Sequence, residues 1–500
     1  MDTLQHLAQG FGVALLPVNL MVAALGALIG TIVGMLPGLG PINGVALLMP
    51  LAFALKLPPE TALILLTAVY IGCEFGGRIS SILLNVPGDA GAIMTAIDGH
   101  PMARKGQGGV ALSISAWASF VGSTIATAGI VLFAPLLARW ALAFGPAEYF
   151  ALMCFAFACI TGLMGNQPIK AVLGAALGLS LSTVGLDSNS GVYRFTGDNV
   201  HLSDGIQFIV VVIGLFSVSE ILLMLEHQAS TSGLIRTVGR TIFNARELAL
   251  TGWTIVRSSL LGFVVGVLPG AGATIASAMA YSVEKRLNDK DGSFGQGDIR
   301  GVSAPEAANN ASANGSFIPM LTLGVPGSGT TAVMVGALSL YNITPGPALF
   351  TQQPALVWGL IASMFVANAL LLLINIPLVG VFTRLLLVPN WLLVPGILAI
   401  SAVGVYSIHA TTFDLLLMGG FGIAGYLLRK AGVPMAPLIL GFVLGDLMEQ
   451  NLRRALSITN GDLSILWGSP ITVGLWVGVA AMLLLPPLYR RWSRGGAAAA

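Results

Sequence analysis

Polar side chains that could bind an ion or a small anion gather in two stretches of an otherwise apolar chain. The first stretch contains Asn43, Glu74, Arg78, Ser80, Ser81, Asn85 and Asp89. The second contains Glu306, Asn309, Asn310, Ser312, Asn314, Ser316, Ser328, Thr330 and Thr331. Ionisable groups in a membrane are costly and usually face the interior of a helix bundle, so they are functional candidates. Their oxygen atoms suit Na⁺, and their donors suit a carboxylate.

The composition indicates what kind of fold must position these groups. Of the 500 residues, 55% are hydrophobic and 9% charged, whereas soluble domains carry about 25% charged residues. The hydrophobic residues would fill roughly 14 segments of about 20 residues, the length that crosses a bilayer. We predict an all-α polytopic membrane protein with about 12 transmembrane helices plus broken or re-entrant segments.

Other classes of protein fit poorly. A net charge of +2 with scattered basic residues gives no face for nucleic acid. Cys73, Cys154 and Cys159 lack metal-ligand spacing and are interpreted as buried thiols. A P-loop, H-E-x-x-H and G-x-S-x-G are all absent from the sequence, so we expect no ATP-driven chemistry and no enzyme.

Basic residues predict the topology. No Lys or Arg precedes Lys56, which favours an N-terminus on the outer side and a C-terminus in the cytoplasm. The basic loops at 100–105, 236–246, 285–300 and 429–430 are placed in the cytoplasm, and the acidic segment 187–204 outside. One conflict remains, because Arg453 and Arg454 precede the last span while Arg490, Arg491 and Arg494 follow it.

Two motifs recur along the chain. G-x-x-x-G-x-L-P-G-L-G at 30–40 returns as G-x-x-x-G-x-L-P-G-A-G at 262–272, and L-N-V-P-G-D at 84–89 returns as L-G-V-P-G-S at 323–328. We interpret residues 1–230 and 251–500 as two transmembrane repeats joined by a cytoplasmic linker at 231–250. Equivalent loops differ in charge, which predicts inverted topology, a pattern typical of secondary transporters.

The Pro-Gly pairs of these motifs predict helix breaks. Proline removes a backbone N–H, and glycine permits angles that other residues avoid. Freed backbone groups are not tolerated facing lipid, so the four breaks should be buried and converge. For Gly30, Gly34, Gly262 and Gly266, close packing of helices is the favoured interpretation.

The isolated charges have two interpretations each. Arg78 could take a carboxylate with its planar fork, or it could form a structural ion pair with Glu74, four residues away. Lys170 and Glu220 are interpreted as packing or snorkelling at span ends rather than as transport residues.

Over nearly its whole length the chain resembles the large membrane subunit of tripartite tricarboxylate transporters, the TctA-like permeases. The resemblance rests on the runs 34–41, 76–88, 98–103, 266–272, 304–310, 323–328, 441–446 and 449–454. It implies a multi-pass permease of the bacterial inner membrane that works with a small four-span membrane subunit and a periplasmic solute-binding protein. It also implies carboxylate uptake coupled to Na⁺ or H⁺, with no resident cofactor. Small residues are also found in relatives where this chain has Arg78, which makes Arg78 a candidate specificity residue.

The expected site lies between the repeats. Candidate substrate-binding residues are Gly38, Gly40, Asn43, Arg78, Ser80, Asn85, Gly88, Asn310, Asn314, Gly327, Ser328 and Thr330. Candidate cation sites, formed mainly by backbone carbonyls, are Pro37, Pro87, Asp89, Pro269, Gly270, Gly272 and Pro326. Two alternatives stay open: a stand-alone carboxylate or ion channel, and an assembly subunit that does not itself transport.

Overall fold

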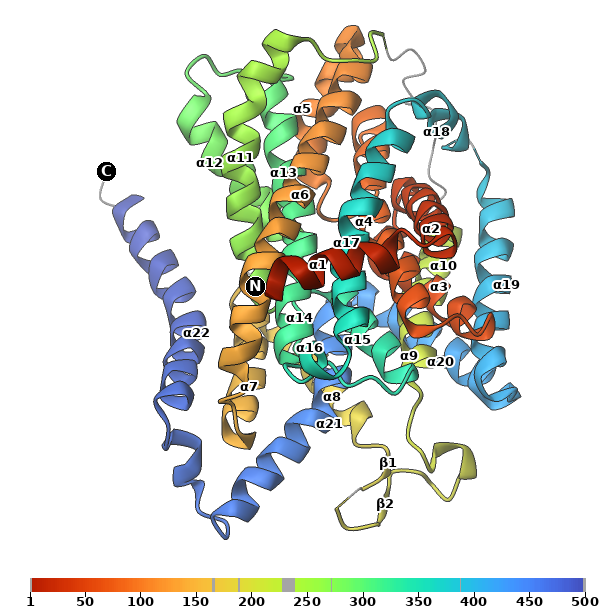
Figure 1. Cartoon of the computed structure of the whole chain (residues 1–500), viewed down its shortest axis with the longest axis vertical. Coiled ribbons are helices and arrows are strands. Elements are labelled where there is room, and N and C mark those ends of the chain that lie inside the picture. Colours follow the sequence, from red (N-terminus) through yellow and green to blue (C-terminus); the bar gives the residue numbers. More distant parts are fainter. Residues whose placement is uncertain are drawn as a thin grey trace.

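The protein is a bundle of helices with a single short β-hairpin in its described part (Figure 1). This computed structural model describes residues 2–163, 167–187, 189–226, 239–270, 272–386 and 388–497. Residues 231–238 of the predicted linker and the side chains of the predicted basic C-terminal tail lie outside the described residues. The prediction of an all-α polytopic fold is confirmed.

The elements of the first half follow one another along the chain. They are α1 (Asp2–Ala14), α2 (Pro17–Met35), α3 (Gly40–Ala54), α4 (Pro59–Leu84), α5 (Ile93–Met102), η1 (Ala103–Gln107), α6 (Gly108–Ala141), α7 (Pro146–Leu163), α8 (Pro168–Ser182), β1 (Gly185–Leu186), β2 (Tyr193–Arg194), η2 (Val200–Leu202), α9 (Phe208–Val212), η3 (Ile213–Val218) and α10 (Ser219–Glu226).

The second half contains more helices and no strand in its described residues. Its elements are α11 (Ala245–Val267), α12 (Gly272–Asn288), α13 (Ile299–Gly315), α14 (Phe317–Leu323), α15 (Gly329–Leu340), α16 (Leu349–Gln352), α17 (Pro354–Asn375), α18 (Val379–Leu385), α19 (Asn390–His409), α20 (Thr412–Lys430), α21 (Met435–Ile458), η4 (Leu463–Trp467) and α22 (Pro470–Ala497).

Helix length agrees with a chain that crosses a bilayer many times. Within the described residues, seven helical stretches are long and apolar enough to span a membrane, and five apolar helices are shorter. Two of the shorter ones, α3 and α15, directly follow Pro-Gly motifs. The breaks therefore divide apolar stretches into pieces, as the sequence predicts.

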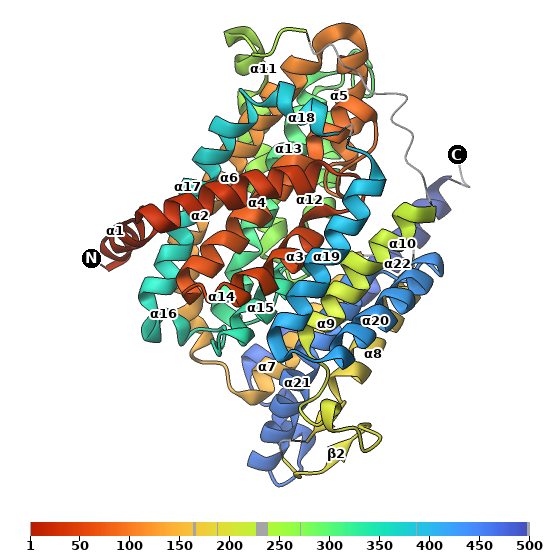
Figure 2. The same ribbon diagram turned by 90° about the vertical axis from the view of Figure 1, so that its right-hand side faces the viewer.

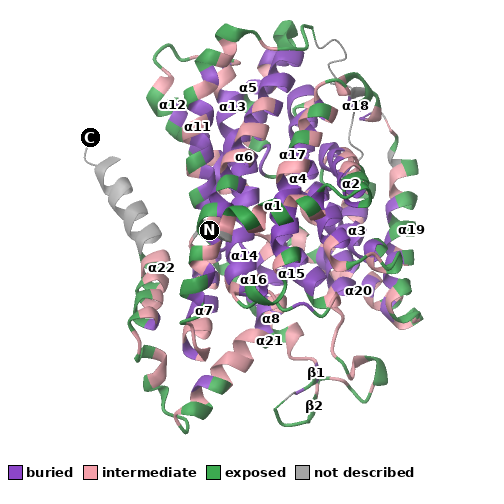
Figure 3. Ribbon diagram, viewed as in Figure 1, coloured by how far each residue is buried: buried purple, intermediate pink, exposed green. Residues whose placement is uncertain are grey.

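Two long helix pairs form the centre of the bundle. Helix α2 packs along α4, and α11 packs along α13; α4 and α13 are buried along most of their length (Figure 3). The packing interpretation of the glycines agrees with these contacts. A Cβ added at Gly34 would lie 2.1 Å from the carbonyl oxygen of Cys73, and one added at Gly266 would lie 2.3 Å from that of Ser312.

Three of the basic loops predicted to be cytoplasmic lie together. The Lys105 ammonium donates to the backbone carbonyl of Gln296 at 2.6 Å, and a Cβ at Gly109 would lie 2.4 Å from the carbonyl oxygen of Arg240. Figure 2 shows α5 and α11 reaching the end of the bundle opposite β2.

Arg453 contacts the segment that is predicted to lie outside. Its guanidinium pairs with Asp187 at 3.2 Å and with Glu449 at 2.5 Å, and Arg194 pairs with Glu449 at 2.8 Å. Arg453 therefore lies beside the segment 187–204, which is predicted to be outside, with its charge neutralised by two carboxylates. Which membrane face this is, and the side of each terminus, stay predictions.

Candidate functional site

The four Pro-Gly motifs interrupt four helices, and the interruptions come in matched pairs. We call them break A (residues 36–39), break B (85–92), break C (268–270) and break D (324–328). Breaks A and C separate α2 from α3 and α11 from α12; breaks B and D separate α4 from α5 and α14 from α15. The expectation of broken helices agrees with the structure, whereas the inverted orientation of the repeats stays a prediction.

Backbone angles repeat between the halves. Gly38 and Gly270 have φ of +87° and +77°, and Gly40 and Gly272 have φ of +61° and +66°. Break B opens at Asn85 and break D at Gly324, both left-handed at φ of +57° and +70°. Because only glycine and asparagine enter this region readily, the motif residues are required by the backbone itself.

The four breaks, together with the helix turns beside them, contact one another in a ring. Breaks A and B meet where a Cβ at Gly88 would lie 2.1 Å from the Gly34 carbonyl oxygen. Breaks B and C are joined by the Ser277 hydroxyl, which donates to the Gly91 carbonyl at 2.7 Å.

Breaks C and D share a backbone hydrogen bond, since Gly270 N–H donates to the Gly327 carbonyl at 2.9 Å. The helices that follow breaks D and A meet, since a Cβ at Gly329 of α15 would lie 2.8 Å from Ile42 Cδ1 of α3. Segments up to about 290 residues apart in sequence thus surround one point between the halves.

Three acidic side chains lie beside this ring. Glu74 accepts a hydrogen bond of 2.9 Å from the Asn309 amide, and its carboxyl is close enough to hydrogen-bond to that of Asp89. Glu306 accepts from Thr95 at 2.6 Å and from Ser119 at 3.1 Å. In the described part of the chain none of these acids has a basic partner within 4.0 Å.

Asparagines of α13 face α6 and α4 with free oxygen atoms. The Asn310 amide donates to Ser119 Oγ at 2.8 Å, and the Asn314 amide donates to Thr127 Oγ1 at 2.9 Å. The Oδ1 atoms of Asn309, Asn310 and Asn314 are buried without a hydrogen-bond partner. Such orphan acceptors are uncommon in native proteins and often mark an ion or water site.

Break D is capped by its own residues. Ser328 and Thr331 form a capping box at the start of α15, and the Tyr70 hydroxyl lies 3.3 Å from Ser328 Oγ and 3.4 Å from Ser316 Oγ. Thr330 and Gly327 are buried nearby. The predicted residues of this break therefore lie against α4 of the other half.

Arg78 does not pair with Glu74. Its Nη1 donates to the Phe75 carbonyl at 2.5 Å and its Nη2 to Asn375 Oδ1 at 3.1 Å, while Nε has no partner. The guanidinium is 1% exposed and lies between α4 and α17. The ion-pair interpretation is wrong for this structure, and two of the donors are already occupied by protein.

Break A is held by Asn43 and Glu220. The Asn43 amide donates to the Leu39 carbonyl, and its Oδ1 is unpartnered. Glu220 pairs with Arg429, and its Oε1 would lie 2.2 Å from a Cβ at Gly38. Glu220 is thus packed against the break instead of snorkelling, while Lys170 donates to the Ala431 carbonyl at 2.7 Å.

The remaining predicted residues lie in the breaks or in the helix turns next to them. Ser80 donates within α4 to Gly77 at 3.3 Å, and Asn85 is exposed. The prolines occupy the breaks with mixed exposure, Pro269 and Pro326 being buried and Pro37 and Pro87 half-buried. In the described residues no three His, Cys, Asp or Glu side chains gather as metal ligands.

The sequence reasoning missed several partners. Asp98, which is fully buried, accepts hydrogen bonds of 2.8 Å from the backbone N–H groups of Gly295, Gly297 and Asp298 and from the Tyr281 hydroxyl. It anchors the loop that precedes α13. The sequence signal that could have identified Asp98 is a charged residue inside an apolar stretch.

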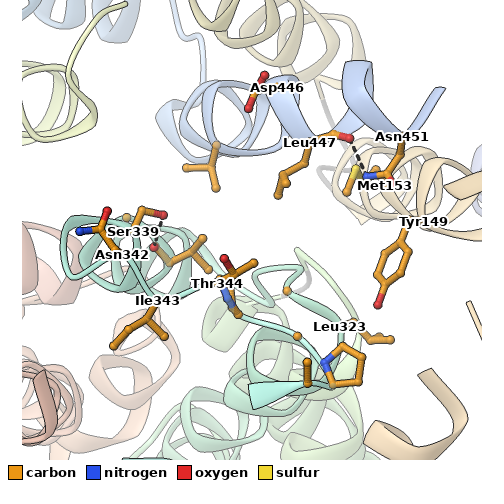
Figure 4. A pocket seen from close by; sticks show the side chains of 18 of the residues that line it. Tyr149, Met153, Leu323, Ser339, Asn342, Ile343, Thr344, Asp446, Leu447 and Asn451 are labelled. Atoms are coloured by element: carbon orange, nitrogen blue, oxygen red, sulfur yellow. Dashed lines mark hydrogen bonds between the residues drawn. The ribbon is translucent and has the colours of Figure 1, made fainter. Parts of the chain in front are cut away.

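A cavity of about 750 Å³ opens beside break D (Figure 4). Its wall includes Leu323 and Gly324 of the break region, Tyr149 of α7, and Asp446 and Asn451 of α21. Its lining contains one carboxylate and no basic side chain. The cavity lies on the part of α21 that leads to Arg453, so it faces the end of the bundle that carries the segment 187–204.

Comparison with known proteins agrees with the motifs. The model of the tripartite tricarboxylate transporter TctA family matches residues 20–440. The chain belongs to this family. The TctA family member is also 42% identical over 491 residues to an uncharacterized 52.8 kDa protein in the TAR-I ttuC' 3' region of Agrobacterium vitis, covering 98% of this chain and 97% of that protein.

A second relative from Agrobacterium vitis, an uncharacterized protein in the TAR-II ttuC' 3' region, is 46% identical over 230 residues, covering 45% of this chain and 95% of that protein. No solved structure matches the chain. Membership in the TctA family implies a multi-pass membrane component of a tripartite transporter instead of an enzyme.

Proposed function

We propose that this TctA family protein is the permease subunit of a binding-protein-dependent secondary transporter for di- and tricarboxylates. The observation that carries the proposal is the ring of four helix breaks between the two halves. Broken helices at the contact of two repeats are where secondary transporters bind substrate and coupling ions. Family membership supports the carboxylate class of substrate.

In this proposal the breaks supply two kinds of group. Backbone N–H groups at the starts of α3, α12 and α15 carry partial positive charge that suits a carboxylate. Freed carbonyls and the carboxyl groups of Glu74 and Asp89 suit a cation, Na⁺ or H⁺. The cation offsets the negative charge of the substrate, so that both cross together.

The cavity beside break D supports a route by which the substrate enters the protein from one side of the membrane. Its opening toward the end with Arg453, and the polar side chains of Asp446 and Asn451 in its mainly apolar wall, fit a vestibule that receives substrate from a periplasmic binding protein. Its lack of basic side chains argues against the cavity as the final carboxylate site. Movement of one half against the other at the ring then completes alternating access.

The proposed setting is the bacterial inner membrane, with a small four-span membrane subunit as a second partner. The most informative experiment is uptake into proteoliposomes that contain the purified protein and both partners. We expect carboxylate uptake that requires the binding protein and an imposed Na⁺ or proton gradient. Uptake without either would favour a channel, and no uptake would favour an assembly subunit.

A variant tests the role of the breaks directly. The double substitution Pro269→Ala with Gly270→Ala removes the residues that open break C, and we expect folded, inserted protein to lose uptake. Full uptake by that variant would contradict a site built from broken helices. Gly252→Ala on α11 is the matched control, since a Cβ there meets nothing within 4 Å.

A further inference from the structure

An unpartnered oxygen and two carboxyl groups meet at break B, where the halves touch. The Asn309 amide nitrogen donates to Glu74 Oε2 at 2.9 Å. Because a carboxylate accepts and does not donate, this bond fixes which end of the amide points to Glu74. The other end, Oδ1, is buried, accepts no hydrogen bond and points away from Glu74.

The free oxygen of Asn309 faces Asp89 across Gly91. The position that a Cβ of Gly91 would take lies 2.1 Å from Asn309 Oδ1 and 3.2 Å from Asp89 Oδ2. Asp89 Oδ1 is used separately, since it accepts from Ala92 N–H at 3.0 Å. Asn309 Oδ1 and Asp89 Oδ2 therefore lie close to the same side of Gly91, and Asn309 Oδ1 approaches so closely that no side chain could stand there.

The charges at this point need a positive partner. Glu74 and Asp89 have no Lys, Arg or His within 4.0 Å among the described residues. Arg78, one turn along α4, uses both terminal nitrogens on Phe75 and Asn375. Glu74 is buried and Asp89 is half-buried, and two neighbouring carboxylates repel each other unless a cation or a proton is bound.

The open acceptor of Asn309 suits a metal ion. A hard cation takes carboxylate and amide oxygens together and would occupy the unpartnered Asn309 Oδ1. A proton on Glu74 would instead be donated to an amide turned the other way, and the binding test separates the two. With two carboxylates, one amide and the carbonyls of a broken helix, the ligands resemble in kind those of Na⁺ sites in transporters.

We propose that Asp89, Glu74 and Asn309 form a Na⁺ site at the contact between break B and α13. The carboxyl groups supply charge, Asn309 supplies a neutral oxygen held in place by Glu74, and Gly91, which has no Cβ, lets Asn309 approach Asp89. This inference rests on the proposed function, because it assigns the coupling ion and its ligands. The sequence predicts cation sites formed mainly by backbone carbonyls near the motif prolines. The site proposed here is formed instead by side chains from both halves.

The site predicts how the halves are coupled. Asp89 and Glu74 belong to the first half and Asn309 to the second, so the ion can be fully coordinated only while break B lies against α13. Binding of Na⁺ therefore favours the arrangement described here over any arrangement in which the halves have moved apart.

The test is Na⁺ binding by the purified full-length protein. Thermal unfolding is measured in NaCl, LiCl, KCl, CaCl₂ and choline chloride at equal ionic strength, together with retention of radioactive Na⁺. We expect Na⁺ to raise the Tm by a few degrees over choline, because a ligand that binds only the folded state stabilises it. No Na⁺-specific shift, or a larger shift with Ca²⁺, would overturn the proposal.

Three variants and one control locate the ion. Asn309→Ala removes the neutral ligand, Asp89→Asn removes a charge, and Gly91→Ala displaces Asn309 Oδ1. Each should weaken Na⁺ binding about tenfold or more, which corresponds to about 1.4 kcal/mol. Asn368→Ala is the control, because Asn368 is also buried with a free Oδ1 but lies at α6 and α17. Equal Na⁺ binding by Asn309→Ala and Asn368→Ala would sink the assignment.

The two proposals fail separately. If carboxylate uptake is driven by a proton gradient alone and Na⁺ does not bind, the transport function stands and the Na⁺ site is wrong. If Na⁺ binds as expected but no gradient drives uptake with both partners present, the site stands and the transport proposal is wrong.

Discussion

The two halves of the bundle share their helix breaks but not their charges. Asp89 and Ser328 occupy equivalent places, and each accepts a hydrogen bond from the backbone N–H three residues later, at 3.0 Å and 3.2 Å. The single side-chain oxygen of Ser328 is engaged in this hydrogen bond. Asp89 has a second carboxyl oxygen and a negative charge in addition. Glu74 of the first half likewise corresponds by position to Ala313 of the second.

The difference in charge between the halves separates the structural role of the helix breaks from the role of the carboxyl groups. The breaks recur in both halves because they let four helices end at one point between the halves, which is a requirement of the fold. Glu74 and Asp89 have no acidic counterpart at the equivalent positions of the second half, so they are not needed for the break itself. We infer that the shared geometry positions the site and that the first half supplies most of its charge.

The largest loss of stability should come from substituting the glycines at which the helices of each half pack closely. Gly34→Ala places a Cβ 2.1 Å from a backbone carbonyl oxygen of the facing helix, and Gly266→Ala places one at 2.3 Å. We expect each to cost at least about 1–3 kcal/mol, because the obstacle is backbone and cannot rotate away. Thermal unfolding and gel filtration measure the loss.

Comparison of these two variants also tests the equivalence of the halves. Similar losses in both would confirm that α2 on α4 and α11 on α13 pack alike. If Gly266→Ala were tolerated while Gly34→Ala failed to fold, the equivalence would be wrong for this helix pair.

A smaller loss should follow from changing Asp98, whose equivalent in the second half is Ala337. Asp98→Asn presents an amide group to donors that need an acceptor, and we expect a loss of about 1–3 kcal/mol. Faster proteolysis in the loop 289–298 should accompany it. Tyr281→Phe, which removes one of the four hydrogen bonds, should cost less; equal stability of Asp98→Asn and the unaltered protein would contradict the anchoring role.

Ser328→Ala should have a moderate and purely structural effect. The substitution removes an N-cap, which contributes about 1 kcal/mol. Because Ser328 carries no charge, the rise in Tm with Na⁺ should persist in the variant. Loss of that rise would mean that break D belongs to the cation site, and the contrast with Asp89 would no longer hold.

The smallest effect concerns the ion pairs around Glu449. The hydrogen bond from the Arg194 guanidinium is the main cause that lowers the pKa of Glu449, and partial burial opposes it. A carboxyl group with a lowered pKa adds stability above its unfolded pKa of about 4.3, and that stability disappears as the pH falls through the folded value.

We therefore expect Glu449→Gln to cost a few tenths of a kcal/mol at pH 7, since the side chain is 27% exposed. The difference from the unaltered protein should shrink as the pH falls below 4.3. Thermal unfolding at pH 7 and at pH 4 checks this. A difference that grows toward acid pH would mean that another group controls the stability of this face.

The sequence predicted the parts that depend on local chemistry. Pro-Gly pairs determine where α2, α4, α11 and α14 end, because these residues act on their own backbone whatever surrounds them. Glycines spaced by four residues likewise predicted the close approach of α2 to α4 and of α11 to α13.

Contacts between distant segments could not be predicted in the same way. The pairing of Arg78 with Asn375 instead of Glu74 depends on how α17 crosses α4, and nothing in the spacing of 78 and 74 contains that information. The acids Glu74 and Asp89 were recognised as candidates from their type. The partner Asn309, which completes their arrangement, became apparent only when the two halves were placed together.

The central claim is that charge in one half, on a backbone common to both, couples a cation to carboxylate uptake. Its most direct test is the initial rate of citrate uptake into proteoliposomes under an inward Na⁺ gradient, with both partners present, for Asp89→Asn and Ser328→Ala. We predict that Ser328→Ala keeps most of the rate per folded protein while Asp89→Asn loses the Na⁺-driven part. Equal rates in the two variants would contradict the account.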